Sequence, residues 1–196
     1  YEFARVKFLE AGYVEVGMDH FALPTDELAK AVEQKTLHRN FMGYTDQKTD
    51  VLLGIGVSSI SESHNMFHQN EKLLPKYEAS LSQNLIPTTR GHVLSQRDIQ
   101  QRKLILELIT TSKVDLKNQF VEFNQNSEFK NLLKEFLNDG LVIMDGETLR
   151  LTSFGKPFLR NICTLFDDYL AKDKAFNSPE VIAAMNKTSA QTSAKK

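Results

Sequence analysis

The sequence predicts an α/β barrel fragment, made of the last strands and helices of a barrel, followed by a mainly α-helical domain with a small winged-helix-like β-hairpin. In residues 1–60, helical and strand-like segments alternate, which is typical of parallel α/β units. In residues 95–155, three short helical patterns precede two strand-like segments separated by a turn. We therefore expect a barrel part in 1–70, a connection in 71–94, a helical C-terminal domain in 95–176 and a flexible tail in 177–196.

The first sixty residues supply the barrel elements. Apolar residues at helical spacing predict a first helix that stops at Gly12, and residues 13–18 then predict a strand. Pro24 and Thr25 open a second helix that runs to about Gln34, with acidic residues in its first turn. Residues 51–60 are an almost continuous apolar run, which is typical of a parallel strand buried on both faces.

The second half is predicted to be mostly helical. A helix is expected within residues 71–82 of the connection, and Ser95 with Asp98 forms the N-terminal signature of a longer one. Further helices are expected to start at Asp115 and at Ser127, and a hairpin joins 141–144 to 148–152. A last helix is expected over 157–172. The side chains expected to point inward from the two middle helices are Leu116, Phe120, Phe123, Leu132, Leu133, Phe136 and Leu137.

The composition excludes several classes of protein. The 24 basic and 25 acidic side chains give a formal net charge of -1, so no global field favours nucleic acid or an anionic membrane. No apolar run approaches the roughly 20 residues that cross a bilayer. Cys163 is the only cysteine, which excludes an internal disulfide and suits a cytoplasmic location. The chain does not begin with methionine, and we expect it to be a piece of a longer protein.

Two further patterns predict no site. Gly54 and Gly56 lie inside a predicted strand, and no helix follows them at the spacing of a dinucleotide-binding loop. His64 and His68 would face one another on a helix, but no third ligand is evident and surface histidines are the better interpretation. We therefore expect no metal site within this chain.

Four stretches, in order and spacing, resemble the oxygen-independent coproporphyrinogen III oxidases. They are Gly17–Ala22 (Gly-Met-Asp-His-Phe-Ala), Leu37–Phe41 (Leu-His-Arg-Asn-Phe), Gly54–Ser61 (Gly-Ile-Gly-Val-Ser-Ser-Ile-Ser) and Arg160–Cys163 (Arg-Asn-Ile-Cys), the last followed by Phe166-Asp167. Neither hydrophobic patterning nor helix capping requires the first two motifs. The resemblance covers nearly the whole chain except the tail.

This resemblance implies a radical S-adenosylmethionine enzyme that converts coproporphyrinogen III to protoporphyrinogen IX by oxidative decarboxylation in haem synthesis. Family members carry a partial α/β barrel, a [4Fe–4S] cluster on a Cys-x3-Cys-x2-Cys loop and a helical C-terminal domain, and they need an electron donor. One cysteine cannot supply three ligands. We therefore expect this chain to bind no cluster and to be inactive alone. A paralogue with a haem-handling role stays open.

The resemblance also suggests site residues, although it assigns no catalytic residue. Asp19, His20 and Arg39 are the candidate substrate-binding residues. Of these, His20 and Arg39 are the candidate propionate contacts, because a tetracarboxylate requires cations or hydrogen-bond donors. Each also has an ordinary structural role open to it, as a turn cap, a loop histidine or an ion-pair partner. Ile60 matches the position that packs against S-adenosylmethionine, although core packing is its ordinary role. Met42 is the second candidate cofactor contact, since it stands where many members have a Gln tied to a second S-adenosylmethionine. Met cannot donate an amide hydrogen bond, which puts that contact in doubt.

The alternative from another class is a winged-helix nucleic-acid-binding module in residues 95–155. Its third helix has Lys130 and Lys134 as its cations, accompanied by acidic side chains. The hairpin tip, Asp145-Gly146-Glu147, is acidic where phosphates would lie. The charge distribution favours the enzyme, with the porphyrinogen as partner, no nucleic acid and no membrane span.

Overall fold

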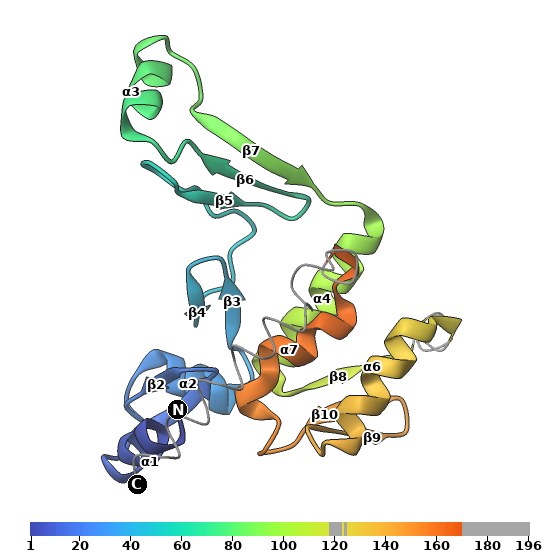
Figure 1. Cartoon of the computed structure of the whole chain (residues 1–196). Helices are drawn as coiled ribbons and strands as arrows, with labels where there is room; N and C mark the ends of the chain where they lie inside the picture. The colour runs from blue at the N-terminus through green and yellow to red at the C-terminus, as the bar shows by residue number, and fades with distance from the viewer. Residues whose placement is uncertain (118–122, 124, 170–196) are drawn as a thin grey trace, which may run out of the picture.

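The computed structural model describes residues 1–117, 123 and 125–169, and within these it consists of helices and small sheets (Figure 1). Phe120, the end of the predicted last helix beyond residue 169 and the predicted tail 177–196 lie outside the described residues. The helices are α1 Glu2–Glu10, α2 Glu27–Gln34, α3 Leu74–Ser82, α4 Gln96–Thr111, α6 Ser127–Asn138 and α7 Leu159–Cys163, with short 3-10 turns η1 Lys156–Phe158 and η2 Thr164–Phe166. None of the described helices has both the length and the apolar character needed to cross a membrane.

The described strands form four small sheets, and every pairing among them is antiparallel. They include two hairpins, β1 Val14–Gly17 with β2 His20–Ala22, and β3 His38–Asn40 with β4 Gly43–Thr45. The strands β5 Ile60–Glu62, β6 Met66–Asn70 and β7 Thr88–Val93 lie side by side in that order. The strands β8 Lys113–Asp115, β9 Val142–Asp145 and β10 Thr148–Leu151 form a sheet with β10 in the middle. The described residues close no barrel.

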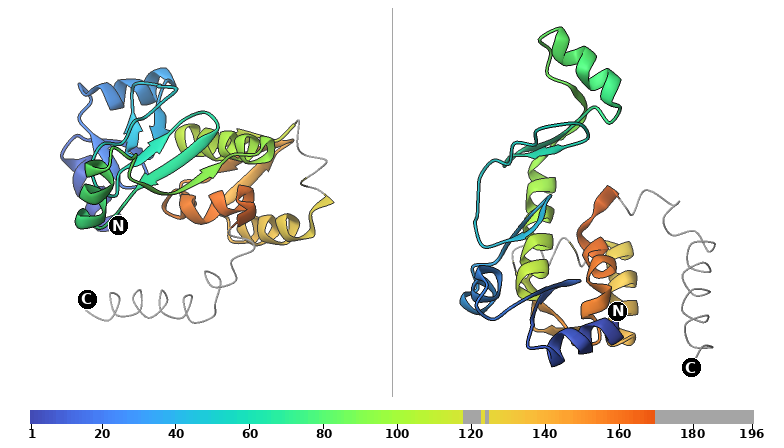
Figure 2. Two further views of the ribbon diagram at one scale, coloured as in Figure 1. Left: turned by 90° about the horizontal axis from the view of Figure 1, so that it is seen from above. Right: turned by 90° about the vertical axis from the view of Figure 1, so that its left-hand side faces the viewer.

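Figures 1 and 2 show how these elements are arranged. The sheet β5-β6-β7, with α3 at its far end, projects from the rest of the molecule as an arm, and α4 leads back from β7 into the body. On one side of α4 lie β8, β9, β10, α6 and α7, and on the other lie the two N-terminal hairpins. Helix α4 is therefore the element that joins the two halves.

Many predicted elements are confirmed, because their local signals are strong. Helix α1 covers the predicted segment, and α2 ends at Gln34 as expected, after beginning at the N-cap Asp26. Ser95 and Asp98 form the expected capping box on α4. Helix α6 starts at Ser127, and the β9–β10 hairpin turns at Gly146 with φ of 61°.

The strand predicted over residues 51–60 is wrong. Leu52 makes one isolated bridge to Glu62, while Val51, Leu53 and Ile55 are 63%, 70% and 86% exposed. Gly56 and Ser58 adopt φ of 100° and 58°, which ends an extended conformation before β5 begins. The apolar run lacks neighbouring strands on both sides within the described residues, so its composition alone does not make it a buried strand.

Three smaller predictions are also wrong. The helix expected to start at Asp115 does not start there, because residues 113–115 pair with β10 as strand β8; most of the rest of that expected helix lies outside the described residues. The predicted continuous last helix is broken into η1, α7 and η2, and Asp167 is extended, with φ of −117° and ψ of 96°. Leu137, expected to point inward, is 37% exposed. In each case, long-range pairing or packing overrides the local pattern.

Residues 71–94, predicted to be a connection, contain β7 as well as the expected helix α3. Strand β7 pairs with β6, which holds His68, so His64 and His68 are not neighbours on a helix. The domain limits at residues 70 and 94 stay a prediction, and the sheet β5-β6-β7 crosses the first of them.

The main core lies where α4, α6 and α7 pack on the sheet β8-β10-β9. Leu108 of α4 is fully buried in it. Its other buried members are Leu104, Val114, Leu116, Phe123, Phe129, Leu141, Val142, Leu149, Leu159, Ile162, Cys163, Leu165 and Phe166. A smaller cluster around Ala29, Ala31 and Tyr44 packs in the N-terminal half. Ile109 of α4 contacts both clusters, so the two cores meet on this helix.

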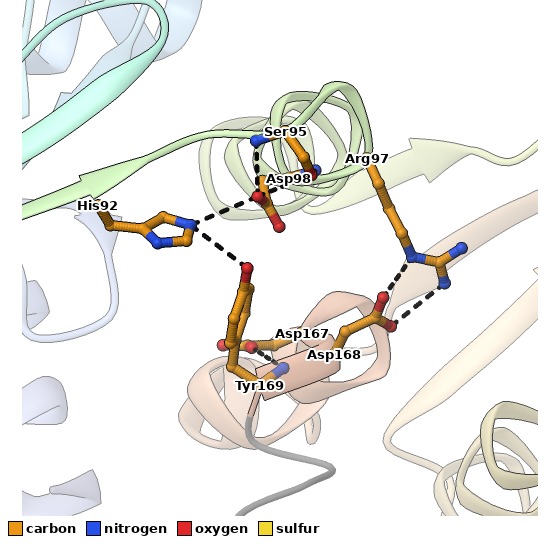
Figure 3. Close-up of polar contacts among 7 residues, drawn as sticks. All are labelled: His92, Ser95, Arg97, Asp98, Asp167, Asp168 and Tyr169. Atoms are coloured by element: carbon orange, nitrogen blue, oxygen red, sulfur yellow. Dashed lines mark hydrogen bonds and ion pairs between the residues drawn. The ribbon is translucent and has the colours of Figure 1, made fainter.

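A cluster of polar contacts fastens the segment after η2 to α4 and to the arm (Figure 3). Arg97 forms an ion pair with Asp168, and the Asp98 carboxylate lies 3.4 Å from His92 Nε2. The Tyr169 hydroxyl lies 3.3 Å from the same nitrogen. Hydrogen bonds from Ser95 are the main reason that the pKa of Asp98 is lowered, so this carboxylate stays ionised and can bind its neighbours.

The core assignment predicts a large difference between two leucines on helices. Leu108→Ala should lower the free energy of unfolding by roughly 2–5 kcal/mol, because it leaves a cavity at a fully buried position. Leu81→Ala on α3 is the matched control, since Leu81 is 47% exposed, and its effect should stay within about 0.5 kcal/mol. Urea denaturation of both variants measures the difference. Equal midpoints would show that α4 does not carry the core.

Candidate functional site

Two adjacent hairpins carry the three residues that the sequence suggested as substrate contacts. Asp19 lies in the tight turn between β1 and β2, and His20 is the first residue of β2. The His20 Nδ1 atom lies 3.1 Å from Asp19 Oδ1, and both side chains are partly exposed. Arg39 is the central residue of β3, and it pairs in register with Tyr44 of β4.

Tyr44 brings these residues together. The guanidinium of Arg39 lies over its ring at 4.7 Å from the centroid, and the His20 ring meets it edge-on at 5.1 Å. The Tyr44 hydroxyl donates a hydrogen bond to the carbonyl oxygen of Ile109, at 3.3 Å. Asp19, His20 and Arg39 therefore form one cluster, although helix α2 separates the two hairpins in the sequence.

A glycine and an unpaired nitrogen mark how closely this cluster is packed. A Cβ atom on Gly17 would lie 2.3 Å from the Tyr44 hydroxyl oxygen, so only glycine leaves room for the ring. The Nη1 atom of Arg39 is buried and has no hydrogen-bond partner among the described residues. Such an atom costs free energy until an acceptor reaches it.

Burial keeps the nearby phenol and thiol neutral. Burial raises the pKa of Tyr44 to about 12, with Cys163 and Asp19 acting in the same direction and the cations Arg39 and Arg160 opposing. Burial also raises the pKa of Cys163 to about 12, against a smaller opposite effect of Arg39. The Tyr44 hydroxyl is therefore a hydrogen-bond donor near neutral pH, and Cys163 is a buried thiol instead of a thiolate ligand.

A separate cavity of about 240 Å³ lies along the base of the arm and contains Ile60. The rings of Phe41 and Phe67 meet edge-on at 5.0 Å in its wall. Its other lining residues are His68, Gln69, Arg90, Gly91 and His92. Because Phe41 belongs to the β3–β4 turn, one hairpin carries residues of both the cavity and the Tyr44 cluster.

An ion pair holds the cavity wall in place. Glu62 is buried, forms an ion pair with Arg102 of α4, and accepts a hydrogen bond from the Phe41 amide at 3.1 Å. Arg102 also covers the Phe67 ring at 4.8 Å and donates to the Ser63 carbonyl oxygen at 3.0 Å. The cavity is therefore tied to the central helix.

Met42 lies in the turn beside this cavity but does not line it. Its side chain is 82% exposed, and its amide donates to Asn40 Oδ1 at 2.9 Å. The sequence paired Met42 with Ile60 as cofactor contacts. The structure places Ile60 in the cavity and Met42 outside it, facing solvent.

A third feature is a cavity of about 270 Å³ beneath the β1–β2 turn. Lys35, Lys113 and Lys156 reach its wall, together with Glu15 and the end of α4. Glu15 accepts hydrogen bonds from Tyr1 and Arg5 and lies 3.5 Å from Lys156 Nζ. Its one carboxylate already pairs with Arg5 and Lys156, and none of the site residues suggested by the sequence lines it, so it is a weaker candidate for a ligand site.

The described residues do not provide ligands for a metal cluster. No group of three or more His, Cys, Asp or Glu side chains in them is arranged to hold a metal ion. Cys163 is buried beside Ile162 and Phe166 in the main core. A [4Fe–4S] cluster therefore does not fit the described part of this chain.

Sequence reasoning did not single out Tyr44 or Glu62, which organise the two sites. Tyr44 lies three positions beyond the matched stretch Leu37–Phe41, and a tyrosine there could have been noted as a ring with a polar end that is often buried. Glu62 follows an apolar run and has no local partner. Its partner, Arg102, is 40 positions away, so no pattern in the sequence pointed to the pair.

Comparisons with known proteins agree with these motifs. No protein-family model matches the chain. It is 38% identical over 170 residues to the oxygen-independent coproporphyrinogen III oxidase of Synechocystis, covering 82% of this chain and 36% of that protein. The oxygen-independent coproporphyrinogen III oxidase of Pseudomonas aeruginosa is 40% identical over 165 residues, and that of Escherichia coli is 39% identical over 166 residues. Each match covers 82% of this chain and 36% of the relative.

A solved structure is similar over most of the fold. The coproporphyrinogen III oxidase HemN from Escherichia coli, a radical SAM enzyme, matches with a TM-score of 0.78 and 36% identity, over 86% of this chain and 40% of that one. The chain thus spans little more than a third of the length of the curated relatives that it matches. It belongs to the family of the oxygen-independent coproporphyrinogen III oxidases and corresponds to a C-terminal portion of its members.

Proposed function

We propose that this chain is the C-terminal part of a radical S-adenosylmethionine enzyme that decarboxylates coproporphyrinogen III to protoporphyrinogen IX, and that it is inactive alone. The family relationship supports the reaction. The observation that carries the assignment to particular residues is the convergence of Asp19, His20 and Arg39 around Tyr44. In this proposal the enzyme works in the cytoplasm, takes electrons from a separate donor and binds no nucleic acid.

In this proposal, residues 1–70 are the last part of a partial α/β barrel. The exposed apolar run Val51–Val57 supports this assignment. Several large apolar side chains exposed close together mark a surface that packs against another part of a protein. Residues 95–176, the helical C-terminal domain, would form a winged-helix-like cover on that barrel. The order β8-β10-β9, with α4 and α6 packed on the sheet, is compatible with such a domain.

S-adenosylmethionine would lie against Ile60 in the cavity at the base of the arm. The apolar side chain of Ile60 and the rings of Phe41 and Phe67 suit the flat, partly apolar adenosyl group. When bound, S-adenosylmethionine supplies the radical chemistry of this family. Met42 would contact the cofactor only if the turn Phe41–Gly43 moved toward it. The [4Fe–4S] cluster would be bound by ligands outside the described residues.

The substrate propionates would be held by Arg39 and His20, and Asp19, a further substrate-site residue, would orient the His20 ring. Arg39 offers a cation, and its buried Nη1 atom lacks an acceptor among the described residues. A propionate that reached it would form a charge-assisted hydrogen bond. Asp19 lies at Nδ1 of His20, which directs the other ring nitrogen toward a ligand. These residues bind and orient the substrate, and they transfer no proton in this proposal.

This chain alone should bind no iron–sulfur cluster. Its single cysteine is buried, and its raised pKa keeps it a thiol. Anaerobic reconstitution followed by iron and sulfide analysis measures the outcome, with Cys163→Ala as the control for adventitious iron. A stoichiometric cluster that is lost in Cys163→Ala would contradict the proposed arrangement.

Ile60→Asp in the longer enzyme should weaken S-adenosylmethionine binding, because a carboxylate would be desolvated against the cofactor at a cost of about 1–3 kcal/mol or more. The dissociation constant should rise at least about tenfold. Ile143→Asp, on the exposed face of β9, is the matched control. Cofactor affinity and thermal stability are measured together. Lost stability with unchanged affinity in the folded fraction would make Ile60 a packing residue only.

Arg39→Ala in the longer enzyme should uncouple cofactor cleavage from product formation. Losing a charge-assisted hydrogen bond of about 1.5–3 kcal/mol should weaken substrate binding by roughly ten- to a hundredfold. His20→Ala should act in the same direction, and more weakly if its ring is neutral. Arg150→Ala, on the hairpin, removes a surface cation that pairs with Asp145 and serves as the control.

The measurement is S-adenosylmethionine cleavage beside the yield of decarboxylated porphyrinogen. Continued cleavage with little product is the expected result for Arg39→Ala. Wild-type substrate affinity and product yield in both Arg39→Ala and His20→Ala would contradict the proposed substrate site. Normal propionate binding without any decarboxylation by the unmodified enzyme would instead favour a haem-handling paralogue.

A further inference from the structure

We propose that Tyr44 is a positioning residue that aims Arg39 and His20 at the same substrate, and that it couples their orientation to helix α4. This inference rests on the proposed function, because it specifies how the proposed substrate site is organised. Tyr44 itself is almost fully buried, 8% exposed, and is not expected to touch the substrate.

The first step concerns Arg39. It pairs with Tyr44 directly across the β3–β4 hairpin, so the two side chains stand on the same face of the sheet. Its guanidinium stacks on the Tyr44 ring at 4.7 Å, which is the geometry of a cation–π contact. Because the buried Nη1 atom has no hydrogen-bond partner among the described residues, ring stacking is a main determinant of where this guanidinium points.

The second step concerns His20. Its ring meets the Tyr44 ring edge-on at 5.1 Å, and its Nδ1 atom lies 3.1 Å from Asp19 Oδ1. A Cβ atom on Gly43 would come to 3.5 Å from Nε2, so the residue beside Tyr44 leaves this nitrogen uncovered on that side. Two contacts thus fix the imidazole plane, and Nε2 lies beside Gly43, which belongs to the same hairpin as Arg39.

The third step is the anchor of the ring itself. The neutral Tyr44 hydroxyl donates to the Ile109 carbonyl oxygen near the end of α4, and it lies where a Cβ on Gly17 would be. Ile109 contacts both hydrophobic clusters. Helix α4 therefore holds the Tyr44 ring in place. The ring in turn holds the side chains of Arg39 and His20, which come from different hairpins.

The alternative is that Tyr44 only fills space in the small N-terminal cluster. Such a role requires volume but neither a ring nor a hydroxyl. The two roles differ in what Tyr44→Phe and Tyr44→Leu do. Phe keeps both ring contacts and loses the anchor, whereas Leu keeps much of the apolar volume and loses both ring contacts.

The first arm of the experiment uses this chain alone and its NMR spectrum. In Tyr44→Leu, the resonances of the His20 ring and the Arg39 Nε–H should move, and the side-chain rotamers of both residues, read from three-bond couplings, should become averaged. Loss of the ring current alone would move the resonances without averaging the rotamers. In Tyr44→Phe both the resonances and the rotamers should change little. Tyr13→Leu is the control, since the Tyr13 ring packs on Phe8 instead. Unchanged rotamers of His20 and Arg39 in folded Tyr44→Leu would overturn the inference, even if their resonances moved.

If Tyr44→Leu does not fold, the same coupling is measured in reverse. Arg39→Gln and His20→Ala alter half-exposed side chains, and each should shift the ring resonances of Tyr44. Neither should shift those of Tyr13. Unchanged Tyr44 resonances in both variants would overturn the inference equally.

The second arm measures substrate affinity in the longer enzyme. Tyr44→Leu should weaken substrate binding by roughly threefold to thirtyfold while S-adenosylmethionine affinity stays unchanged, and Tyr44→Phe should weaken it less. If Tyr44→Leu averages the rotamers but neither it nor Arg39→Ala alters substrate affinity, the proposed function fails and the coupling stands. If Arg39→Ala weakens binding and Tyr44→Leu does not, the positioning role fails and the proposed function stands.

Discussion

The ion pair between Glu62 and Arg102 is the contact on which both candidate sites depend. Glu62 is buried on β5, and Arg102 lies on α4 with its guanidinium over the Phe67 ring. A buried carboxylate is costly unless a cation and hydrogen-bond donors compensate it, and here the Phe41 amide adds a donor. One carboxylate therefore fixes the start of the arm, the β3–β4 turn and the middle of α4 relative to one another.

Helix α4 connects this ion pair to the rest of the described structure, because it contacts both hydrophobic clusters and the arm. One face buries Leu104 and Leu108 in the main core, while its last turn meets the smaller cluster through Ile109. Its N-terminal turn binds the arm and the segment after η2 through Asp98 and Arg97 (Figure 3). Because one rigid helix carries all these contacts, the Tyr44 cluster and the Ile60 cavity keep a fixed relation.

The exposed apolar run before β5 shows what the packed body leaves uncovered. Leu53 and Ile55 face solvent, whereas the polar side chains of Ser61 and Glu62 just beyond them are buried. This is the reverse of the usual distribution. The buried polar groups are satisfied, since Ser61 binds the Gly54 amide and Glu62 binds Arg102. A longer protein that covered the apolar run would therefore gain apolar burial without breaking these bonds.

The sequence by itself determined the local elements and the family motifs. Capping residues such as Ser95 and Asp98, and the turn at Gly146, act within a few positions, so α4 and the β9–β10 hairpin were predictable. Asp19, His20 and Arg39 were found through their motifs. The tertiary structure alone decided that Tyr44 joins them, that Glu62 pairs with Arg102 and that the run before β5 is no strand. These outcomes depend on contacts between residues far apart in the chain, and hydrophobic periodicity reports burial without naming the partner.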